Sequence, residues 1–354
     1  MKNKKFVFFQ MLTGLSKNKL CKNCFFFIGS MPKNIPRKKI WVSLQKDFFI
    51  LEKSDGVRYI FLLGKKKSIL LDRNISLFKL PDFLTLIPKK DGTIFDGEMS
   101  FNFLKEEYEY LIYDVISFER DWRISTWDLT GRCSILNKFK KKKFLNKNSF
   151  AQYIEKKDFF TIKNIQNLFK KIQINFFSYD HIFFNQNRVG NIICNKNDGI
   201  ILSRSKLIFL RKSQSSIFKW KYEKSNSIDF LSIYDLNKNI VKKNFYFTTS
   251  FYCRLKKKNL FNIYEKKKIM FGCCALKYKF RNKSIEEINF NRQKGKWIFS
   301  KKRKDKILPN SNKVVQNTLE NIAEGINKDE IVDRFTKQFC RINKGKLLLM
   351  KLIS

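Results

Sequence analysis

Short runs in which apolar and polar positions alternate fill the first part of the chain, and this pattern is typical of β-strands. The first such stretch, 40–63, is rich in Phe, Ile, Val and Tyr and is interrupted at Ser54, Asp55 and Gly56. Because this triplet is typical of a tight turn, the stretch predicts two antiparallel strands joined there. The runs 93–101 and 110–118 flank a charged segment and predict a second hairpin.

The middle and end of the chain predict helices around a further set of strands. Apolar residues recur near helical spacing over 149–171, after a lysine-rich loop at 138–148. Two more helices are predicted over 311–323 and 329–342, with Ser311 as an N-cap and Gly325 as a stop signal. Strand patterns occupy the intervening runs, which are 191–194, 199–202, 206–210, 217–222 and a strand-rich stretch over 228–299 that includes 245–255 and 269–280.

Charge and composition indicate a globular protein with a polyanionic partner. The chain has 354 residues, with 74 Lys and Arg against 31 Asp and Glu, so its formal net charge is +43. A field of this size attracts polyphosphates and nucleic acids. The excess of Phe, Lys, Ile and Asn is also what an AT-rich genome produces. Net charge alone therefore gives only moderate support for contact with RNA or DNA. With 43% apolar and 16% aromatic residues, the chain is too hydrophobic for a disordered basic tail. Its length favours two domains.

Cysteine usage and the length of the apolar runs indicate which cellular environments suit the protein. Eight cysteines scattered along a chain of this length do not form a disulfide framework and favour a reducing environment. Cys21 and Cys24 form a CxxC pair, but His181 is the only histidine, which argues against a structural zinc site. The longest apolar runs are too short for a membrane span or a signal peptide, so we expect neither.

The predicted turn between the first two strands carries candidate chemistry in the run KSDGVR, from Lys53 to Arg58. Lys53 ends a strand, so its ammonium group can project into a cleft, and Gly56 would let the backbone approach a ligand. A lysine nucleophile must lose its proton, and neighbouring cations lower its pKa. A charged hairpin turn whose Asp-Gly pair adopts positive φ explains the same run equally well. The turn by itself therefore only suggests a nucleophile.

Further motifs follow this turn in a fixed order and resemble a known superfamily. They are DGE at 96–98, YLIYD at 110–114, NDGIIL at 197–202 and KWK at 219–221, the last followed by SIDF at 227–230. With KSDGVR they resemble the covalent nucleotidyltransferases, which comprise mRNA capping guanylyltransferases and ATP- or NAD-dependent polynucleotide ligases. Residues 28–32 also resemble the segment that precedes the nucleophile in these enzymes.

A last motif, WIFSKKRKDKILPN at 297–310, favours the capping branch. It resembles the capping-enzyme motif that is carried by an oligonucleotide-binding (OB) fold. Lys301 stands where the family usually has an Arg, which keeps the charge but loses the bidentate fork. The resemblance implies an α+β protein with an antiparallel-sheet nucleotidyltransferase domain of ATP-grasp or ligase-like type and a β-barrel OB-fold domain.

The resemblance also implies a division of the chain. We expect a basic N-terminal arm over 1–24 and a nucleotidyltransferase domain over 25–230. An OB-fold domain would follow over 231–310, and C-terminal helices over 311–354 would pack back on the nucleotidyltransferase domain.

The activity implied by the resemblance is that of an mRNA guanylyltransferase. GMP would pass from GTP to Lys53, forming a covalent lysyl-N-GMP intermediate, and then to the 5′-diphosphate end of nascent RNA, forming a GpppN cap. Lys219 and Lys221 would neutralise the α-phosphate oxygens and help to hold Lys53 uncharged. Asp198 would hold the divalent metal, Mg²⁺ or Mn²⁺, because a hard cation prefers carboxylate oxygen.

The resemblance assigns the remaining nucleotide contacts in two groups. Arg58 and Glu98 would contact the ribose, while Tyr113 would stack on guanine with Ile200 on the opposite face. The second group lies on the second domain and would reach the β- and γ-phosphates only when that domain closes; it consists of Arg303, Asp305 and Lys306. The basic loop at 256–268 could guide the RNA backbone through salt-sensitive contacts.

Two alternative functions and several partners stay open at this point. An ATP-dependent polynucleotide ligase would share Lys53 and the metal carboxylate, and a noncatalytic basic RNA-binding protein could retain the same fold. Because His181 is followed by Ile182, the chain lacks the His-Cys loop of a phosphatase-type RNA triphosphatase. That activity would come from a separate triphosphatase. The phosphorylated tail of RNA polymerase II is a second partner suggested by the resemblance, and the implied location is the nucleus, including a reduced endosymbiont nucleus.

Overall fold

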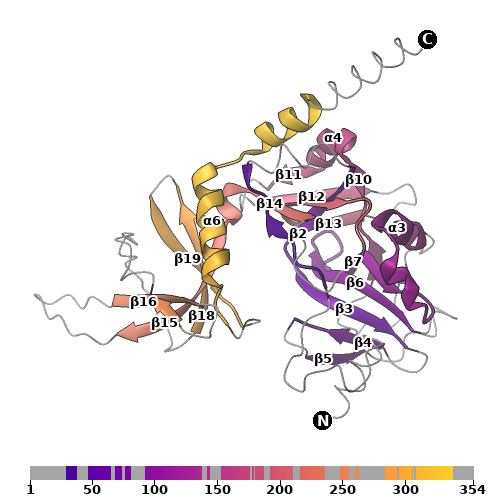
Figure 1. The fold of residues 1–354 in the computed structure, drawn as a ribbon, viewed down its shortest axis with the longest axis horizontal. Helices are drawn as coiled ribbons and strands as arrows, with labels where there is room; N and C mark the ends of the chain where they lie inside the picture. The colour runs from indigo at the N-terminus through magenta and orange to yellow at the C-terminus, as the bar shows by residue number, and fades with distance from the viewer. Residues whose placement is uncertain are drawn as a thin grey trace, which may run out of the picture.

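The computed structural model combines mixed β-sheets with few helices, so the protein is of the α+β class (Figure 1). Its described part forms two seven-stranded sheets and one five-stranded sheet. The first two sheets lie together on one side of the molecule, and the third lies on the other (Figure 1). The structure describes residues 29–37, 47–64, 68–73, 76–80, 92–137, 142–143, 153–175, 178, 180–186, 192–209, 216–235, 248–254, 260–262, 284–292, 295–304, 306 and 308–337.

The first sheet is built around one long strand, β13 (Ile192–Arg204). This strand pairs antiparallel with β14 (Ile217–Lys221), β12 (His181–Gln186) and β2 (Phe48–Ser54). It replaces the two separate strands predicted over 191–202, because residues 195–198 continue the ladder. The short strands at the margins are β1 (Lys33–Asn34), β10 (Phe160–Thr161) and β11 (Ile172–Ile174).

The second sheet has the strand order β5-β4-β3-β6-β7-β9-β8. Its centre is an antiparallel hairpin of two long strands, β6 (Thr93–Asn102) and β7 (Glu107–Ser117), which confirms the hairpin predicted over 93–118. The other strands are β3 (Val57–Leu63), β4 (Ser68–Leu71), β5 (Leu77–Leu80), β8 (Lys142–Lys143) and β9 (Tyr153–Lys156).

The strands on either side of the KSDGVR turn belong to different sheets. β2 pairs with β13 and β10, whereas β3 pairs with β6 and β4, so the predicted hairpin over 40–63 is wrong. Local alternation of apolar residues identifies a strand but not its hydrogen-bonding partner, which is set by long-range register. Gly56 makes this crossing possible, because a Cβ there would lie 2.4 Å from the Met99 carbonyl oxygen. Its φ is not among the positive ones.

The helices of this part of the chain are short and pack against the first two sheets. The helix predicted over 149–171 is wrong over most of its length, because 153–161 form β9, β10 and their connection. Only its end is helical, in η4 (Ile162–Asn164) and α4 (Ile165–Lys170). The strand predicted over 206–210 is also wrong, because residues 206–209 are turn and irregular structure. Two further helices follow β7, and these are η3 (Trp122–Thr126) and α3 (Leu129–Asn137).

The third sheet has the order β17-β16-β15-β18-β19 and contains only antiparallel pairs. A single 3-10 turn, η5 (Glu223–Ser225), connects β14 to its first strand. The domain boundary expected after Phe230 falls within the first strand of this sheet. The strand predicted over 269–280 lies outside the described residues. The strands are β15 (Ser227–Asp235), β16 (Thr248–Arg254), β17 (Leu260–Asn262), β18 (Ser284–Asn291) and β19 (Lys296–Lys302).

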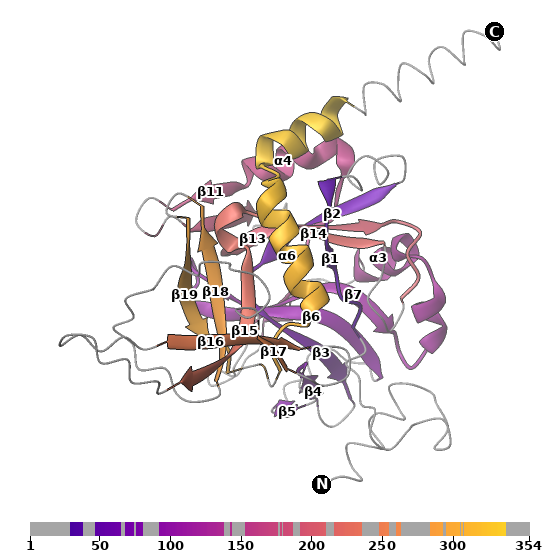
Figure 2. The same ribbon diagram turned by 60° about the vertical axis from the view of Figure 1, so that its left-hand side comes forward.

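Helix α6 (Asn312–Glu324) lies between the third sheet and β1 (Figure 2). Its position confirms the helix predicted near 311–323, with Ser311 at the N-cap and Gly325 ending it at φ 55°. Its buried residues, including Val315 and Ile322, pack on Ile228 of the third sheet. The next helix, 328–337, packs on the first sheet instead, so the two C-terminal helices cover different parts of the molecule. No described helix is long and apolar enough to cross a membrane.

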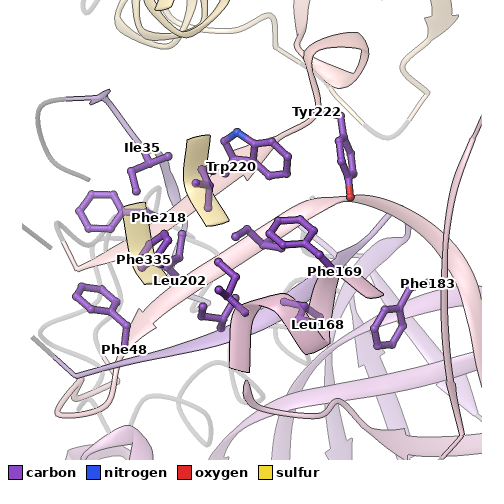
Figure 3. Packing of buried hydrophobic residues seen from close by; sticks show 14 of the residues in the cluster. Ile35, Phe48, Leu168, Phe169, Phe183, Leu202, Phe218, Trp220, Tyr222 and Phe335 are labelled. Atoms are coloured by element: carbon purple, nitrogen blue, oxygen red, sulfur yellow. The ribbon is translucent and has the colours of Figure 1, made fainter. Parts of the chain in front are cut away.

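The largest apolar core lies on one face of the first sheet (Figure 3). Phe218 and Trp220 of β14 pack there with Leu202 of β13, and Phe335 of the C-terminal helix closes the cluster. The Trp220 indole N–H also donates to the Ile326 carbonyl oxygen at 2.9 Å. This core holds β13 and β14 rigidly from behind, so their opposite face can present polar side chains.

Candidate active site

A cavity of about 140 Å³ lies between the first two sheets, where the chain crosses from β2 to β3. Strands β2 and β13 form one wall, and strands β3, β6 and β7 form the other. Most of the charged lining comes from the predicted motifs, including Lys53, Arg58, Glu98 and Tyr113. Segments that are far apart in the sequence therefore meet at one site.

Lys53 and Lys221 share one carboxylate beside this cavity. The Lys53 Nζ lies 2.6 Å from Asp198 Oδ2, and the Lys221 Nζ lies 2.7 Å from the same oxygen. A register shift in β13 at this point turns Asp198 toward the two lysines. Burial opposes ionisation of Asp198, but the charges of Lys53 and Lys221 outweigh it and lower its pKa to about 2.

The bulge at Asp198 depends on Gly199. Its φ is 139°, and a Cβ there would lie 2.0 Å from the Trp220 carbonyl oxygen. The Asn197 side chain fixes the same turn, because it donates to the carbonyl oxygens of Lys53 and Gly199 and accepts from the Gly199 N–H. The NDG run therefore places the carboxylate through backbone geometry that only glycine tolerates.

The pKa of Lys219 is depressed, whereas that of Lys53 is raised. Burial, followed by the charges of Lys221 and Lys53, lowers the pKa of Lys219 to about 7. Burial also acts to lower the pKa of Lys53, but Asp198 and Glu98 outweigh it and raise the pKa above its ordinary value. The prediction that neighbouring cations hold Lys53 uncharged is therefore wrong for this arrangement, because the ammonium group has a carboxylate partner at hydrogen-bonding distance.

Arg58 lines the cavity, but its guanidinium is already bound by protein groups. Both carboxylate oxygens of Asp96 accept from it, with Nε at 2.8 Å from Oδ1. Its Nη1 donates to the Ser30 carbonyl oxygen at 2.7 Å, so the segment that resembles the region before the nucleophile does lie beside the motif. Arg58 therefore has a clear role in joining β3, β6 and the segment near Ser30.

Glu98 belongs to a buried polar network behind Lys53. Its Oε2 accepts from the Ser54 hydroxyl at 2.7 Å and lies 3.4 Å from Lys157 Nζ. Burial opposes its ionisation, but Lys157 and Lys53 outweigh it and lower its pKa. Lys157 also lies 3.0 Å from Glu52 Oε1. The sequence analysis did not identify Lys157 or Glu52, because Lys157 lies in a run predicted to be helical and Glu52 lies just before the KSDGVR motif.

Tyr113 faces the cavity from β7, opposite an apolar residue of β13. Its hydroxyl donates to Asp96 Oδ1 at 2.8 Å, and burial raises its pKa well above the ordinary value. The apolar residue across the cavity is Ile201, whereas Ile200 is 0% exposed in the core on the other side of the sheet. The prediction that Ile200 faces the base is therefore wrong, and the neighbouring Ile201 lines the cavity instead. The bulge at Asp198 sets which residues of β13 point to each face of the sheet, and the sequence pattern did not reveal this bulge.

Three residues of the last motif, Arg303, Lys306 and Asn310, meet at one buried carboxylate, that of Asp229. Arg303 Nη1 donates to Asp229 Oδ1 at 3.0 Å, and Lys306 Nζ and the Asn310 amide both donate to Oδ2. Lys301 is exposed and lies 3.8 Å from Glu287. Asp305 lies outside the described residues. The motif is thus organised by Asp229 of the SIDF run, whose role as an anchor the sequence analysis did not identify.

Arg73 links the cavity to this second cluster. It lines the cavity and was not predicted as a site residue. Part of its side chain is exposed, but partial burial lowers the pKa of Arg73. The positive charges of Arg58 and, to a smaller extent, Arg303 lower that pKa further. The last motif is therefore within electrostatic reach of the cavity.

The carboxylate of Asp198 suits a divalent cation as one ligand among several. The described residues contain no cluster of three or more His, Cys, Asp or Glu side chains that could hold a metal alone. Mg²⁺, however, is commonly bound by one or two carboxylates together with substrate phosphates and water. A single ionised carboxylate beside a cavity lined with cations suits that mode, with the other ligands coming from the nucleotide.

Comparison with known proteins agrees with the order of these motifs. The family model described as the mRNA capping enzyme catalytic domain matches residues 7–223, and the model of its C-terminal domain matches 225–332. An mRNA-capping enzyme of Caenorhabditis elegans is 25% identical over 353 residues, covering 91% of this chain and 51% of that protein. An mRNA-capping enzyme subunit alpha of Neurospora crassa is 22% identical over 221 residues, covering 58% of this chain and 53% of that protein.

The solved structures found by comparison are more distant. A mycobacterial DNA ligase D complexed with ATP aligns with a TM-score of 0.42 at 9% identity, covering 78% of this chain and 94% of the ligase. A Lig E DNA ligase aligns with a TM-score of 0.38 at 13% identity, covering 79% of this chain and 100% of that one. The chain spans about half the length of the curated relatives it matches. Since the two family models together match nearly all of residues 7–332, the chain belongs to the mRNA capping enzyme family.

Proposed function

We propose that this chain is an mRNA guanylyltransferase. It transfers GMP from GTP to the 5′-diphosphate end of nascent RNA and leaves a GpppN cap. The observation that carries this proposal is the meeting of Lys53 and Lys221 at Asp198, with Lys219 within electrostatic reach, next to the cavity between the first two sheets. Lysines gathered around one carboxylate provide both a nucleophile and the positive charge that a triphosphate needs.

The reaction has two steps, in which GMP passes first to Lys53 and then to the RNA. The uncharged Lys53 Nζ attacks the α-phosphorus of GTP, the nitrogen–phosphorus bond forms, and the bond to the β-phosphate oxygen breaks and releases pyrophosphate. A terminal phosphate oxygen of the RNA then attacks the same phosphorus, and the bond to Lys53 breaks. Lys219 and Lys221 stabilise the charge on the α-phosphate oxygens in both steps.

Lys53 must lose its proton before the first step, and Asp198 controls when it does. The Asp198 carboxylate favours the ammonium form in the arrangement described above. If the charge of Asp198 is neutralised, burial and the positive charges of Lys219 and Lys221 favour the free amine instead. Mg²⁺ or Mn²⁺ held by Asp198 would supply that neutralisation and would polarise the phosphates.

The remaining residues position the nucleotide. The base lies between Tyr113 and Ile201, and Glu98 accepts from the ribose hydroxyls. Arg73 contacts the triphosphate from the rim of the cavity, while Arg58 orients Asp96 and Tyr113. Residues Arg303, Asp305 and Lys306 bind the β- and γ-phosphates when the third sheet, which we propose to be an OB-fold domain, closes over the cavity.

The partners and location follow from this activity. The substrates are GTP and 5′-diphosphate RNA, and a separate RNA triphosphatase supplies the diphosphate end. The phosphorylated tail of RNA polymerase II would bring the protein to the transcript in the nucleus, including a reduced endosymbiont nucleus. The division into an arm, a nucleotidyltransferase domain over 25–230, an OB-fold domain over 231–310 and C-terminal helices also remains a proposal.

The decisive experiment incubates the purified protein with α-labelled GTP or ATP and a divalent metal. We expect label from GTP to stay with the denatured protein and to be released by acid, as a phosphoramidate requires. Lys53→Ala should abolish it, whereas Lys79→Ala, which removes an exposed lysine of β5 outside the cavity, should not.

Two other outcomes would each support a rival function. Label from ATP alone would identify a ligase-type adenylyltransferase. Absence of label from both nucleotides, together with RNA binding that survives Lys53→Ala, would identify a noncatalytic RNA-binding protein.

A further inference from the structure

Asp114 faces the cavity beside the ring on which the base stacks. It directly follows Tyr113 in β7, and both residues line the cavity. Consecutive residues of a regular strand point to opposite faces. Here the register passes from Asp96 opposite Asp114 to Gly97 opposite Ile112, so β7 carries an extra residue and both side chains reach the same space.

This carboxylate has charged neighbours in Arg132, which pairs with it, and Asp96, and apolar side chains form much of the nearby wall. Leu129, Leu207, Phe209 and Ile217 line the same end of the cavity. The Asp114 side chain is 13% exposed, and burial raises its pKa although Arg132 opposes that shift. A charged group placed among apolar side chains costs free energy unless its hydrogen bonds are made. The Asp114 carboxylate therefore needs hydrogen-bond partners at this end of the cavity.

Four donated hydrogen bonds hold Arg132 in place, and they leave part of the acceptor capacity of Asp114 open. Its Nε and Nη2 donate to the two carboxylate oxygens at 2.7 and 3.0 Å. Its Nη1 donates to the carbonyl oxygens of Trp127 and Leu207. Asp114 Oδ1 accepts a second hydrogen bond from the Val115 N–H, while Oδ2 has Arg132 as its partner among the described residues. Since a carboxylate oxygen can accept about two hydrogen bonds, Oδ2 retains one acceptor position.

We propose that Asp114 is a specificity-determining residue that accepts a hydrogen bond from the 2-amino group of guanine. The assignment rests on the guanylyltransferase function proposed above. Guanine carries donors at N1 and at its 2-amino group, whereas adenine has an acceptor at N1 and no 2-amino group. A carboxylate at the end of the base slot would therefore favour GTP over ATP. The ribose and phosphate contacts cannot make that choice, because both nucleotides share them.

Arg132 acts as a positioning residue in this arrangement. Its bidentate contact orients the carboxylate plane, and its bonds to the Trp127 and Leu207 carbonyl oxygens tie that plane to α3 and to the wall of the cavity. The pair is thus rigid before any nucleotide arrives, which lowers the entropic cost of reading the base.

The test compares three nucleotides as donors for the adduct on Lys53. ITP lacks the 2-amino group, and XTP carries a carbonyl oxygen in its place. We expect the wild-type protein to use ITP and XTP roughly tenfold or more less efficiently than GTP, measured as kcat/KM for adduct formation. In Asp114→Asn the side-chain amide can donate to the xanthine carbonyl. The ratio of XTP to GTP efficiency should therefore rise by roughly tenfold to a hundredfold.

A purely structural role for Asp114 gives a different result. It would lower the efficiency with all three nucleotides by the same factor and leave their ratios unchanged, which would overturn the assignment. Asp121→Asn is the matched control, because it weakens an exposed Asp–Arg pair with Arg123 and should leave every ratio unaltered.

The wild-type ratios keep the proposal falsifiable if Asp114→Asn fails to fold. Equal use of GTP and ITP by the wild-type protein would refute the contact with the 2-amino group while leaving the guanylyltransferase function intact. Absence of any adduct from GTP would instead refute the proposed function, and this assignment with it.

Discussion

At the residue scale, the chemistry of the site depends on how charge is shared among three lysines. Asp198 pairs with Lys53 and Lys221 and so keeps Lys53, the proposed nucleophile, protonated, while the pKa of Lys219 is depressed. Near neutral pH, the partly unprotonated lysine is therefore Lys219, which is a neighbour of Lys53. Because a bound triphosphate favours the charged form of Lys219, nucleotide binding and protonation are coupled at this residue.

The pKa of Lys219 predicts a pH dependence of folding stability. Folded Lys219 releases its proton near pH 7, whereas in the unfolded chain it keeps the proton up to its ordinary value of 10.5. The unfolded state thus binds more protons between these values, so Lys219 makes the free energy of unfolding rise with pH across that window. Lys219→Met should remove this rise, as measured by urea unfolding at pH 7 and pH 9. An identical pH dependence in both proteins would contradict the assignment.

Two adjacent isoleucines should respond differently to truncation. Ile200→Ala opens a hole in the main core and should cost about 2–5 kcal/mol of unfolding free energy. Ile201→Ala removes the surface opposite Tyr113 and should mainly raise the KM for GTP. Thermal unfolding and adduct kinetics on both variants separate the two roles. If Ile200→Ala were the variant with the higher KM and unchanged stability, the orientation of β13 described here would be wrong.

At the scale of elements, the site forms where strands of two sheets face each other. The chain leaves β2 in one sheet and enters β3 in the other, so KSDGVR lies between them. Irregular positions in β13 and in the β6–β7 pairing then turn Asp198 toward Lys53 and Lys221, and Asp114 toward the cavity. Regular ladders would have directed both carboxylates elsewhere. The bulges are therefore part of the functional architecture.

The bulge in β13 predicts a severe effect of Gly199→Ala. A Cβ at this position would collide with the Trp220 carbonyl oxygen, which would force β13 and β14 apart and displace Asp198. We expect a marked fall in the midpoint of thermal unfolding and loss of the GTP adduct. Gly295→Ala is the matched control, since Gly295 also has positive φ, but a Cβ added there would meet no described atom within 4 Å. Its backbone strain should cost only about 1–2 kcal/mol.

At the scale of the whole molecule, the net charge and the placement of the third sheet suit the proposed substrates. The charge of +43 favours RNA, and the third sheet carries Arg303 and Lys306 within electrostatic reach of the cavity. Both residues are held by Asp229, so closure would bring a preformed basic cluster to the triphosphate. The C-terminal helix packs Phe335 into the core of the first sheet, which anchors the far end of α6.

The net charge predicts a steep dependence of RNA binding on salt. If the surface contacts about 6–10 phosphates, affinity for single-stranded RNA should fall by about 300-fold to 16,000-fold between 50 and 200 mM salt. Adduct formation with GTP relies on buried groups that salt screens less, so it should fall much less. Filter binding and adduct assays over the same salt series check this. A flat RNA-binding curve would mean that the surface lysines reflect genome composition and not contact with RNA.

The sequence alone determined the order of the motifs, the family, the β6–β7 hairpin and the limits of α6, because these depend on residue identity, turn chemistry and local periodicity. Lys53, Lys221 and Asp198 were found because each lies in a distinctive short run. Only the tertiary structure decided that β2 and β3 enter different sheets, that Ile201 and not Ile200 faces the cavity, and that Lys157, Arg73 and Asp114 line it. These facts depend on strand partners and bulges, which arise from contacts between residues far apart in the chain and leave little trace in local sequence patterns.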